Sequence, residues 1–330
     1  MRESRIRVRR LLVACLAPVV LATASLLHRD ASAQEWPTRP IRWIVPFPPG
    51  GPADVTARLI APKLTARLGQ PVVVENRPGA SSNIGYEAAV RANPDGYTML
   101  LAVAGLVTNP HVFKLNFDPM KDLVPVAQLN SLQMVLLGSE KFAARNLSEA
   151  MAHANANPGT VTCAWGGSVL LQLVCESLRL EGKADIQAVA YKGGAPAMTD
   201  LIGGQVDMMI DVINTAVPQI KAGKVKLLAV ANRSRGRAPF PDAPTIAESI
   251  PGFEMNTWQG VMMPAGTPKE IVSKMNAAIG WALAQPDVAA RVAESGLDVA
   301  FGTPEQFGAL LRNDFEKYGR LIRAAGISTQ

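Results

Sequence analysis

The segment Ile41-Arg-Trp-Ile-Val-Pro-Phe-Pro-Pro-Gly-Gly-Pro-Ala-Asp-Val-Thr-Ala-Arg-Leu59 joins an apolar, β-branched run to a helical pattern through a cluster of prolines and glycines. Three further glycine-containing junctions come after predicted strands, at Gly79–Gly85, Trp165–Ser168 and Tyr191–Pro196. In open α/β sheets, ligands bind beyond the carboxyl ends of the strands. Helix starts at that edge offer unpaired N–H groups and a partial positive charge. Together the four junctions predict an anion site, although each one alone also fits a simple tight turn.

Short runs of apolar, strand-forming residues alternate along the chain with segments that have the apolar spacing of a helix. The pattern predicts strands at 41–47, 72–75, 97–102, 135–137, 161–164, 186–191, 206–210, 225–231 and 259–262. It predicts helices at 54–68, 83–92, 171–180, 198–202, 269–284, 286–295 and 304–325. This alternation favours an α/β fold, with a parallel or mixed sheet covered by helices on both faces.

The first 33 residues have the pattern of a cleavable secretory signal peptide. Basic residues precede an apolar run over 11–27, and Ala31-Ser-Ala33 is a small-residue cleavage site. A lipoprotein box at Leu12–Cys15 would have too short an apolar segment before it, and the residues around Arg9-Arg10 do not support a twin-arginine signal. Removing residues 1–33 lowers the formal net charge from +6 to +2. Without a basic run interleaved with aromatic residues, nucleic acid is not expected as a partner.

Two cysteines, Cys163 and Cys175, remain after the predicted cleavage. An exported protein permits a disulfide between them, and two buried free thiols are the alternative. Only His111 and His153 remain beyond the signal segment, far apart and without clustered carboxylates. A zinc site needs three or four converging ligands, so no metal site is expected.

Motifs for cofactor binding and catalysis are incomplete. Gly51 is followed by Pro52-Ala53, which breaks both the phosphate-loop and the dinucleotide patterns. The run Gly166-Gly-Ser168-Val-Leu170 begins like a nucleophile elbow but lacks the final glycine. We therefore expect no cofactor and no catalytic residue, with a hydrolase using Ser168 as a minor alternative.

The sequence resembles the extracytoplasmic solute receptors of tripartite tricarboxylate transporters, the Bug family. The resemblance covers nearly the whole chain after residue 33, and it rests on the order and spacing of many short motifs. These are Trp36–Ile41, Val45–Gly51 with Asp54, Val74–Ala80, Pro94–Tyr97, Tyr191–Pro196, Gly204–Met209, Lys224–Val230, Pro244–Glu248, Pro251–Phe253 and Pro264–Pro268.

The resemblance implies a type II periplasmic binding protein, with two α/β lobes joined by a hinge of crossing strands. Lobe 1 would comprise residues 34–139 and 255–330, and lobe 2 residues 140–254. Such a protein is not an enzyme. It would act in the periplasm as a monomer, close on a small carboxylate and deliver it to membrane transporter subunits; a receptor for a signalling partner is the alternative.

The resemblance also implies that main-chain amides and waters hold the carboxylate. Carried over by position, the ligand-binding residues are Phe47, Gly50, Gly51, Asp54, Ser81, Ser82, Ala104 and Gly105 in lobe 1, and Trp165, Gly166, Gly167, Ser168, Tyr191 and Asp211 in lobe 2. Asp54 has a structural alternative, because a carboxylate in a first helical turn caps free amides. Family members commonly have Gly-Gly at Ser81-Ser82, and they often have a Ser/Gly-rich turn followed by a histidine where this chain has Cys163–Ser168 and Gln172. These differences leave the ligand unidentified: Trp165 fits an aromatic or apolar-tailed acid, or a simple wall of the binding site.

Overall fold

The computed structural model describes residues 36–231, 233–235, 239–294 and 297–327. The chain divides into two compact units, residues 1–38 and 39–330, and both β-sheets belong to the second unit. The predicted signal peptide over 1–33 lies outside the described residues.

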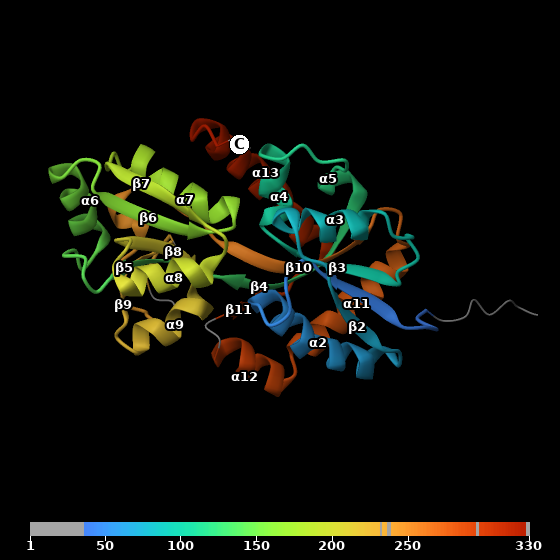
Figure 1. Cartoon of the computed structure of the whole chain (residues 1–330). Coiled ribbons are helices and arrows are strands. Elements are labelled where there is room, and N and C mark those ends of the chain that lie inside the picture. The colour runs from blue at the N-terminus through green and yellow to red at the C-terminus, as the bar shows by residue number, and fades with distance from the viewer. Residues whose placement is uncertain (1–35, 232, 236–238, 295–296, 328–330) are drawn as a thin grey trace, which may run out of the picture. The chain divides into compact units, whose positions relative to one another are not determined.

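One sheet has six strands, in the order β11-β4-β10-β3-β1-β2 (Figure 1). The strands are β1 (Ile41–Val45), β2 (Val72–Asn76), β3 (Thr98–Val103), β4 (Leu123–Leu132), β10 (Thr257–Pro264) and β11 (Asp298–Val299). β1 is parallel to β2 and β3, whereas β10 is antiparallel to β3 and β4. The carboxyl ends of β1 and β3 therefore lie at the same edge of this sheet.

The other sheet has five strands, in the order β7-β6-β8-β5-β9. They are β5 (Met134–Ser139), β6 (Val161–Gly166), β7 (Ile186–Tyr191), β8 (Met208–Val212) and β9 (Val225–Val230). β6 is parallel to β7 and β8, and β5 is antiparallel to β8 and β9. Both sheets are mixed, in agreement with the strand–helix alternation of the sequence.

The chain passes from the first sheet to the second at Gln133, between β4 and β5, and returns between β9 and β10. At the return, Ala231 N–H donates to Met134 O (2.9 Å), and Met255 N–H donates to Ala231 O (3.2 Å). The predicted lobe boundaries, after residue 139 and before residue 255, stay predictions. The chain enters the second sheet at β5, which begins at Met134, before the predicted first boundary.

Fourteen helical segments lie among the described residues. They are α2 (Pro52–Leu68), η1 (Ala80–Ser82), α3 (Asn83–Val90), α4 (Gly105–Thr108), η2 (Asn109–His111), α5 (Pro119–Asp122), α6 (Leu147–Ala156), α7 (Val169–Leu180), α8 (Gly194–Gly203), α9 (Ile213–Lys221), α10 (Ile246–Ser249), α11 (Lys269–Leu283), α12 (Pro286–Glu294) and α13 (Pro304–Ala324). α2 starts with Pro52, whose missing N–H has no helical partner, and ends at Gly69 in the left-handed conformation. None of the helices in the described ranges is long and apolar enough to span a membrane.

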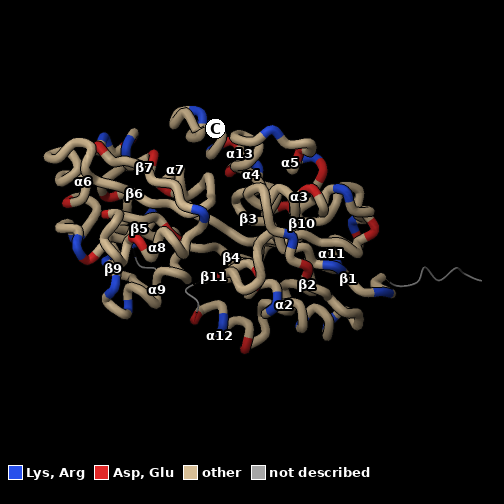
Figure 2. Tube along the Cα trace, viewed as in Figure 1, with Lys and Arg blue, Asp and Glu red and all other residues tan. Residues whose placement is uncertain are grey.

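Each sheet is covered by helices that bury its apolar residues. Ile44, Leu100 and Phe307 belong to one buried cluster, and Val135, Leu137 and Met209 belong to another. Acidic and basic residues are interspersed over the elements of both sheets (Figure 2). The glycine-rich segments that follow β1, β6 and β7 are the predicted anion-binding junctions.

Candidate functional site

A cavity of about 640 Å³, which we call the cleft, is lined by residues from both sheets. The described lining residues are Phe47–Ala53, Val103, Leu132, Met134, Ser168, Leu170, Leu171, Lys192–Pro196, Val212 and Thr257–Gln259. Three of the four predicted junctions thus contribute to the same space: the loops before α2 and α8, and Ser168 before α7. Lys192 is the one charged residue among these described lining residues, and it is exposed.

Asp54 holds the first of these loops. Its buried carboxylate accepts hydrogen bonds from Gly50 N–H (2.9 Å), Arg58 Nε (2.9 and 3.0 Å) and Asn76 Nδ2 (2.8 Å). Asn76 Nδ2 also donates to Phe47 O at 3.0 Å. Asp54 is not among the cleft-lining residues. These contacts support its structural alternative, in which it positions the loop that the ligand would touch.

Burial opposes ionisation of Asp54, but the hydrogen bonds from Arg58, Gly50 and Asn76 outweigh it and hold the pKa of Asp54 below its ordinary value. A depressed folded-state pKa adds stability above the unfolded-state pKa, and this stability is lost as the pH falls through the folded value. We therefore expect Asp54→Asn to cost about 1–3 kcal/mol at pH 7, because charge-assisted hydrogen bonds are lost. The cost should shrink towards zero below about pH 4, where the unfolded carboxyl is protonated. Urea unfolding at several pH values measures it.

The matched control is Asp287→Asn, which removes an ion pair to Lys63 (2.7 Å) from a carboxylate that is 63% exposed. An exposed pair contributes about 0–1 kcal/mol, so this variant should change little at any pH. A pH-independent cost for Asp54→Asn would contradict the assigned role.

The second loop is built by close backbone contact between two glycine pairs. A Cβ atom at Gly166 would lie 2.4 Å from both Gly193 C and Gly194 N. Gly167 and Gly193 have φ values of +67° and +116°, which L side chains rarely adopt. The end of β6 thus packs directly against the start of α8. This contact places Ser168, the residue before α7, beside the N-terminus of α8 on the cleft wall.

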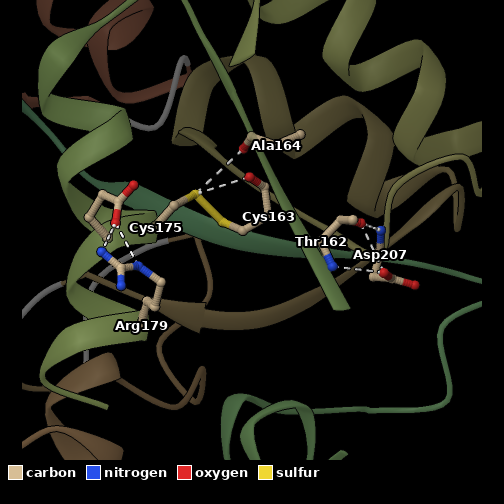
Figure 3. The surroundings of a disulfide bond; sticks show 7 residues. Thr162, Cys163, Ala164, Cys175, Arg179 and Asp207 are labelled. Carbon is tan, nitrogen blue, oxygen red and sulfur yellow. Dashed lines mark hydrogen bonds and ion pairs between the residues drawn. A yellow bond between two sulfur atoms is a disulfide. The ribbon is translucent and has the colours of Figure 1, made fainter. Parts of the chain in front are cut away.

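A disulfide fixes the elements on either side of that turn. Cys163 in β6 and Cys175 in α7 are buried and joined by a bond between their sulfurs (Figure 3). Cys175 Sγ also contacts the carbonyl oxygens of Cys163 and Ala164, at 3.5 and 3.8 Å. Next to it, Thr162 N–H and Oγ1 both lie 2.9 Å from Asp207 Oδ2. Of the two alternatives that the sequence left open, the structure has the disulfide.

Ser81, Ser82, Ala104 and Gly105 lie outside the set of residues that line the cleft. Ala80, Ser81 and Ser82 have φ values of +46°, +52° and +76°, so three successive non-glycine residues adopt the left-handed region. Their turn is tied down by Asn109, whose Nδ2 donates to Ser81 O and Asn83 Oδ1, both at 2.8 Å. Ligand contact by these four predicted residues stays a prediction.

Trp165, Gly166, Gly167, Tyr191 and Asp211 are also outside the set of lining residues. Tyr191 Oη donates to Asp200 Oδ2 at 2.7 Å, and burial together with this carboxylate raises the pKa of Tyr191. Burial likewise raises the pKa of Asp211, against hydrogen bonds from Thr215 Oγ1 (2.7 Å) and Val212 N–H (2.8 Å). Both side chains brace elements of the five-stranded sheet, and their ligand contacts remain predictions.

The floor of the cleft was not predicted from the sequence. Leu132, Met134, Val212, Thr257 and Gln259 come from strands that meet only in the folded chain. Gly193, Gly194 and Lys192 were part of a predicted junction but not of the predicted site. Ser168 lines the cleft. The two histidines make other contacts: His111 Nε2 is 2.9 Å from Phe315 O, and His153 packs edge-on to Phe142.

Residues 56–327 of the chain match a protein family described as "Tripartite tricarboxylate transporter family receptor". Protein BugT of Bordetella pertussis is 34% identical over 316 residues, covering 93% of this chain and 95% of BugT. An R. palustris protein, whose structure is with adipate, superposes with a TM-score of 0.81 at 31% identity, over 89% of this chain and 100% of that one. MatC from Rhodopseudomonas palustris with bound malate gives 0.77 at 34% identity, over 87% and 100%.

These likenesses confirm the predicted periplasmic binding-protein fold. Both the family match and the BugT match extend over most of the chain. The chain therefore belongs to the tripartite tricarboxylate transporter receptor family, the Bug proteins, which are periplasmic solute-binding receptors and not enzymes.

Proposed function

We propose that this protein captures a small carboxylate in the cleft and delivers it to the membrane subunits of a tripartite transporter. The observation that carries the proposal is that one cavity is lined by two glycine-rich helix starts, Gly50-Gly51 before α2 and Gly193-Gly194 at the start of α8. Adipate and malate, which accompany two related structures, are both carboxylates. Since the family consists of receptors rather than enzymes, the Ser168 hydrolase alternative is set aside.

The first turn of a helix has N–H groups without intrahelical partners and a partial positive charge. A carboxylate bound there accepts charge-assisted hydrogen bonds, worth roughly 1.5–3 kcal/mol each. Backbone donors also avoid burying a lysine or arginine, whose desolvation costs several kcal/mol. Of the predicted ligand residues, we assign direct contact to those that line the cleft: Phe47, Gly50, Gly51 and Ser168. Because the Gly50 N–H already donates to Asp54 (2.9 Å), Gly50 would contact the ligand without its N–H group.

Because the lining comes from both sheets, a ligand that touches both loops stabilises the arrangement in which they approach each other. The ligand-bound form would then be the one that the membrane subunits recognise. A sensing role would use the same binding step, and transport is proposed because the family consists of transporter receptors. Export to the periplasm through the signal peptide over residues 1–33 and action as a monomer belong to the same proposal.

The test is a thermal-melting screen of the purified protein with di- and tricarboxylates, acidic amino acids and aromatic acids. At a ligand concentration of 100 times Kd, binding should stabilise the folded protein by about 2.7 kcal/mol. The neutral amide of each active acid is the matched control and should give no shift. If no acid shifts the melting temperature, or if acid and amide shift it equally, the proposal is wrong. Delivery is tested by ligand-dependent association with the membrane subunits.

A further inference from the structure

Most of the side chains that line the cleft are apolar. The polar ones among the described lining residues are Ser168, Lys192, Thr257 and Gln259. Trp258 also lines the cleft, but its indole N–H donates to Asp314 Oδ2 (2.8 Å) and is therefore not available to a ligand. Since the carboxylate of the ligand is assigned to the glycine-rich helix starts, the rest of the ligand packs against the remaining lining. The character of that lining therefore determines which acid the cleft accepts.

The floor of the cleft presents apolar side chains from both sheets. Met134 of β5 and Val212 of β8 are directly opposite each other, and residues in opposite positions have their side chains on the same face of a sheet. Two residues before Met134, Leu132 of β4 lies opposite Thr257 of β10. Leu132 and Met134 are buried, and Val212 is half-buried and packs against the core. A ligand on this floor meets hydrocarbon on either side of the crossing between the sheets.

The walls of the cleft continue this apolar surface up to the helix starts. Leu170 and Leu171 lie in the first turn of α7, directly after Ser168, and both line the cleft. Val103 is the last residue of β3, at the same sheet edge as the end of β1. Leu171 and Val103 are half-buried, so part of each side chain is open to the cleft. Apolar side chains thus adjoin the backbone donors that we assign to the carboxylate.

The cleft is also larger than a compact acid needs. The share of liquid volume taken by one water is about 30 Å³, so a cavity of about 640 Å³ has room for about twenty waters. Replacing poorly ordered water by an apolar group gains affinity. A hydroxyl group that leaves water for an apolar wall loses its hydrogen bonds without replacement, which costs affinity. The cleft should therefore favour an acid whose body is hydrocarbon.

We propose that the ligand is an acid with an alkyl or ring-shaped apolar body, and that Val103, Leu132, Met134, Leu171 and Val212 are the specificity-determining residues that receive this body. This inference rests on the proposed function, in which the helix starts hold the carboxylate. A hydroxylated acid of the same length meets the same donors for its carboxylate, yet it binds more weakly because its hydroxyl groups find no partners on the walls.

Calorimetry with hexanoate and gluconate tests the inference. Both acids have one carboxylate on a straight chain of equal length, but gluconate has a hydroxyl group on every other carbon. We expect the wild-type protein to bind hexanoate at least about ten-fold more tightly. Along the series butanoate, hexanoate and octanoate, affinity should rise about four-fold per methylene group until the cleft is filled. The heat-capacity change of binding should be more negative for hexanoate than for gluconate.

Two substitutions in the lining test the assigned residues. Val103→Thr adds a hydroxyl group with little change of shape, so hexanoate affinity should fall at least about five-fold and gluconate affinity should change less. Its matched control is Val73→Thr, at a strand valine that is 52% exposed and outside the cleft. Leu171→Gln should have the same effect as Val103→Thr and keeps the test usable if that variant does not fold. Its control is Leu180→Gln, at the other end of α7, where the leucine is 41% exposed. Both controls should leave every affinity unchanged.

The inference alone is overturned if gluconate binds as tightly as hexanoate, if affinity does not rise with chain length, or if only compact or hydroxylated acids of the wider screen bind. Equal losses in a lining variant and its control would also overturn it. If no acid of either set binds at all, the proposed function fails with it. The two failures are therefore distinguishable.

Discussion

Replacing Gly166 by alanine is expected to destabilise the protein by about 3 kcal/mol and to abolish carboxylate binding, because the new methyl group overpacks a rigid contact. Its Cβ would lie 2.4 Å from Gly193 C and Gly194 N and 2.7 Å from Gly193 O. All three are backbone atoms, so no side chain can rotate away. Relief requires the start of α8 to move, and with it the N–H groups that we assign to the ligand. Urea unfolding and calorimetry with the tightest acid of the screen measure both effects.

Gly167 provides the matched control one residue further along. A Cβ there would be no closer than 3.7 Å to its neighbours, so the cost comes from its φ of +67° alone. A left-handed alanine costs about 1–2 kcal/mol, and the packing of Gly193 against β6 is left intact. Gly167→Ala should therefore retain ligand affinity within a few-fold. Equal losses of affinity in the two variants would mean that contact with α8 does not position the site.

The strand–helix alternation and the glycine junctions could be predicted because both are local. Strand β7 and the helices α11 and α13 follow the expected ranges closely, since their apolar spacing matches a single period. β4 was missed because Pro125 interrupts its pattern. In the structure, a register shift between Val261 and Met262 of β10 lies opposite Pro125, where a strand proline is tolerated. Likewise α9 was not predicted because Pro218 interrupts its helical pattern, although the residues before Pro218 are helical in the structure.

The lining of the cleft was predicted only in small part, for a related reason: four of the fourteen predicted ligand residues belong to it. Gly50, Gly51 and Ser168 were found because they belong to the junctions themselves. Gln259 was missed, since its neighbour Asn130 is 129 residues away in the sequence. The junction at Ser81-Ser82 has the same strand-to-helix pattern, but neither serine lines the cleft. Its turn is held by a hydrogen bond from the Asn109 side chain, so the sequence pattern alone did not distinguish a lining junction from this one.

The disulfide carries the second large expected effect. Cys163 and Cys175 are 12 residues apart, and closing a loop of this size removes unfolded-state entropy worth about 3 kcal/mol. Replacing both by alanine should therefore lower the free energy of unfolding by about that amount. The disulfide joins β6 to α7, and these two elements flank the turn that ends at Ser168. Affinity for the acid should fall as well, because the turn loses an anchor at each end.

Reductant is the internal control for this prediction. Unfolding of the wild-type protein in excess dithiothreitol should converge on the value of the double alanine variant, whereas the variant itself should not respond. Thiol titration of the wild-type protein, denatured without reductant, should find no free thiol at Cys163 or Cys175. Two titratable thiols, or equal stabilities with and without reductant, would show that this bond does not form in the exported protein. The constraint on the Trp165–Ser168 turn would then rest on the Gly166 contact alone, and Gly166→Ala would be the more damaging change.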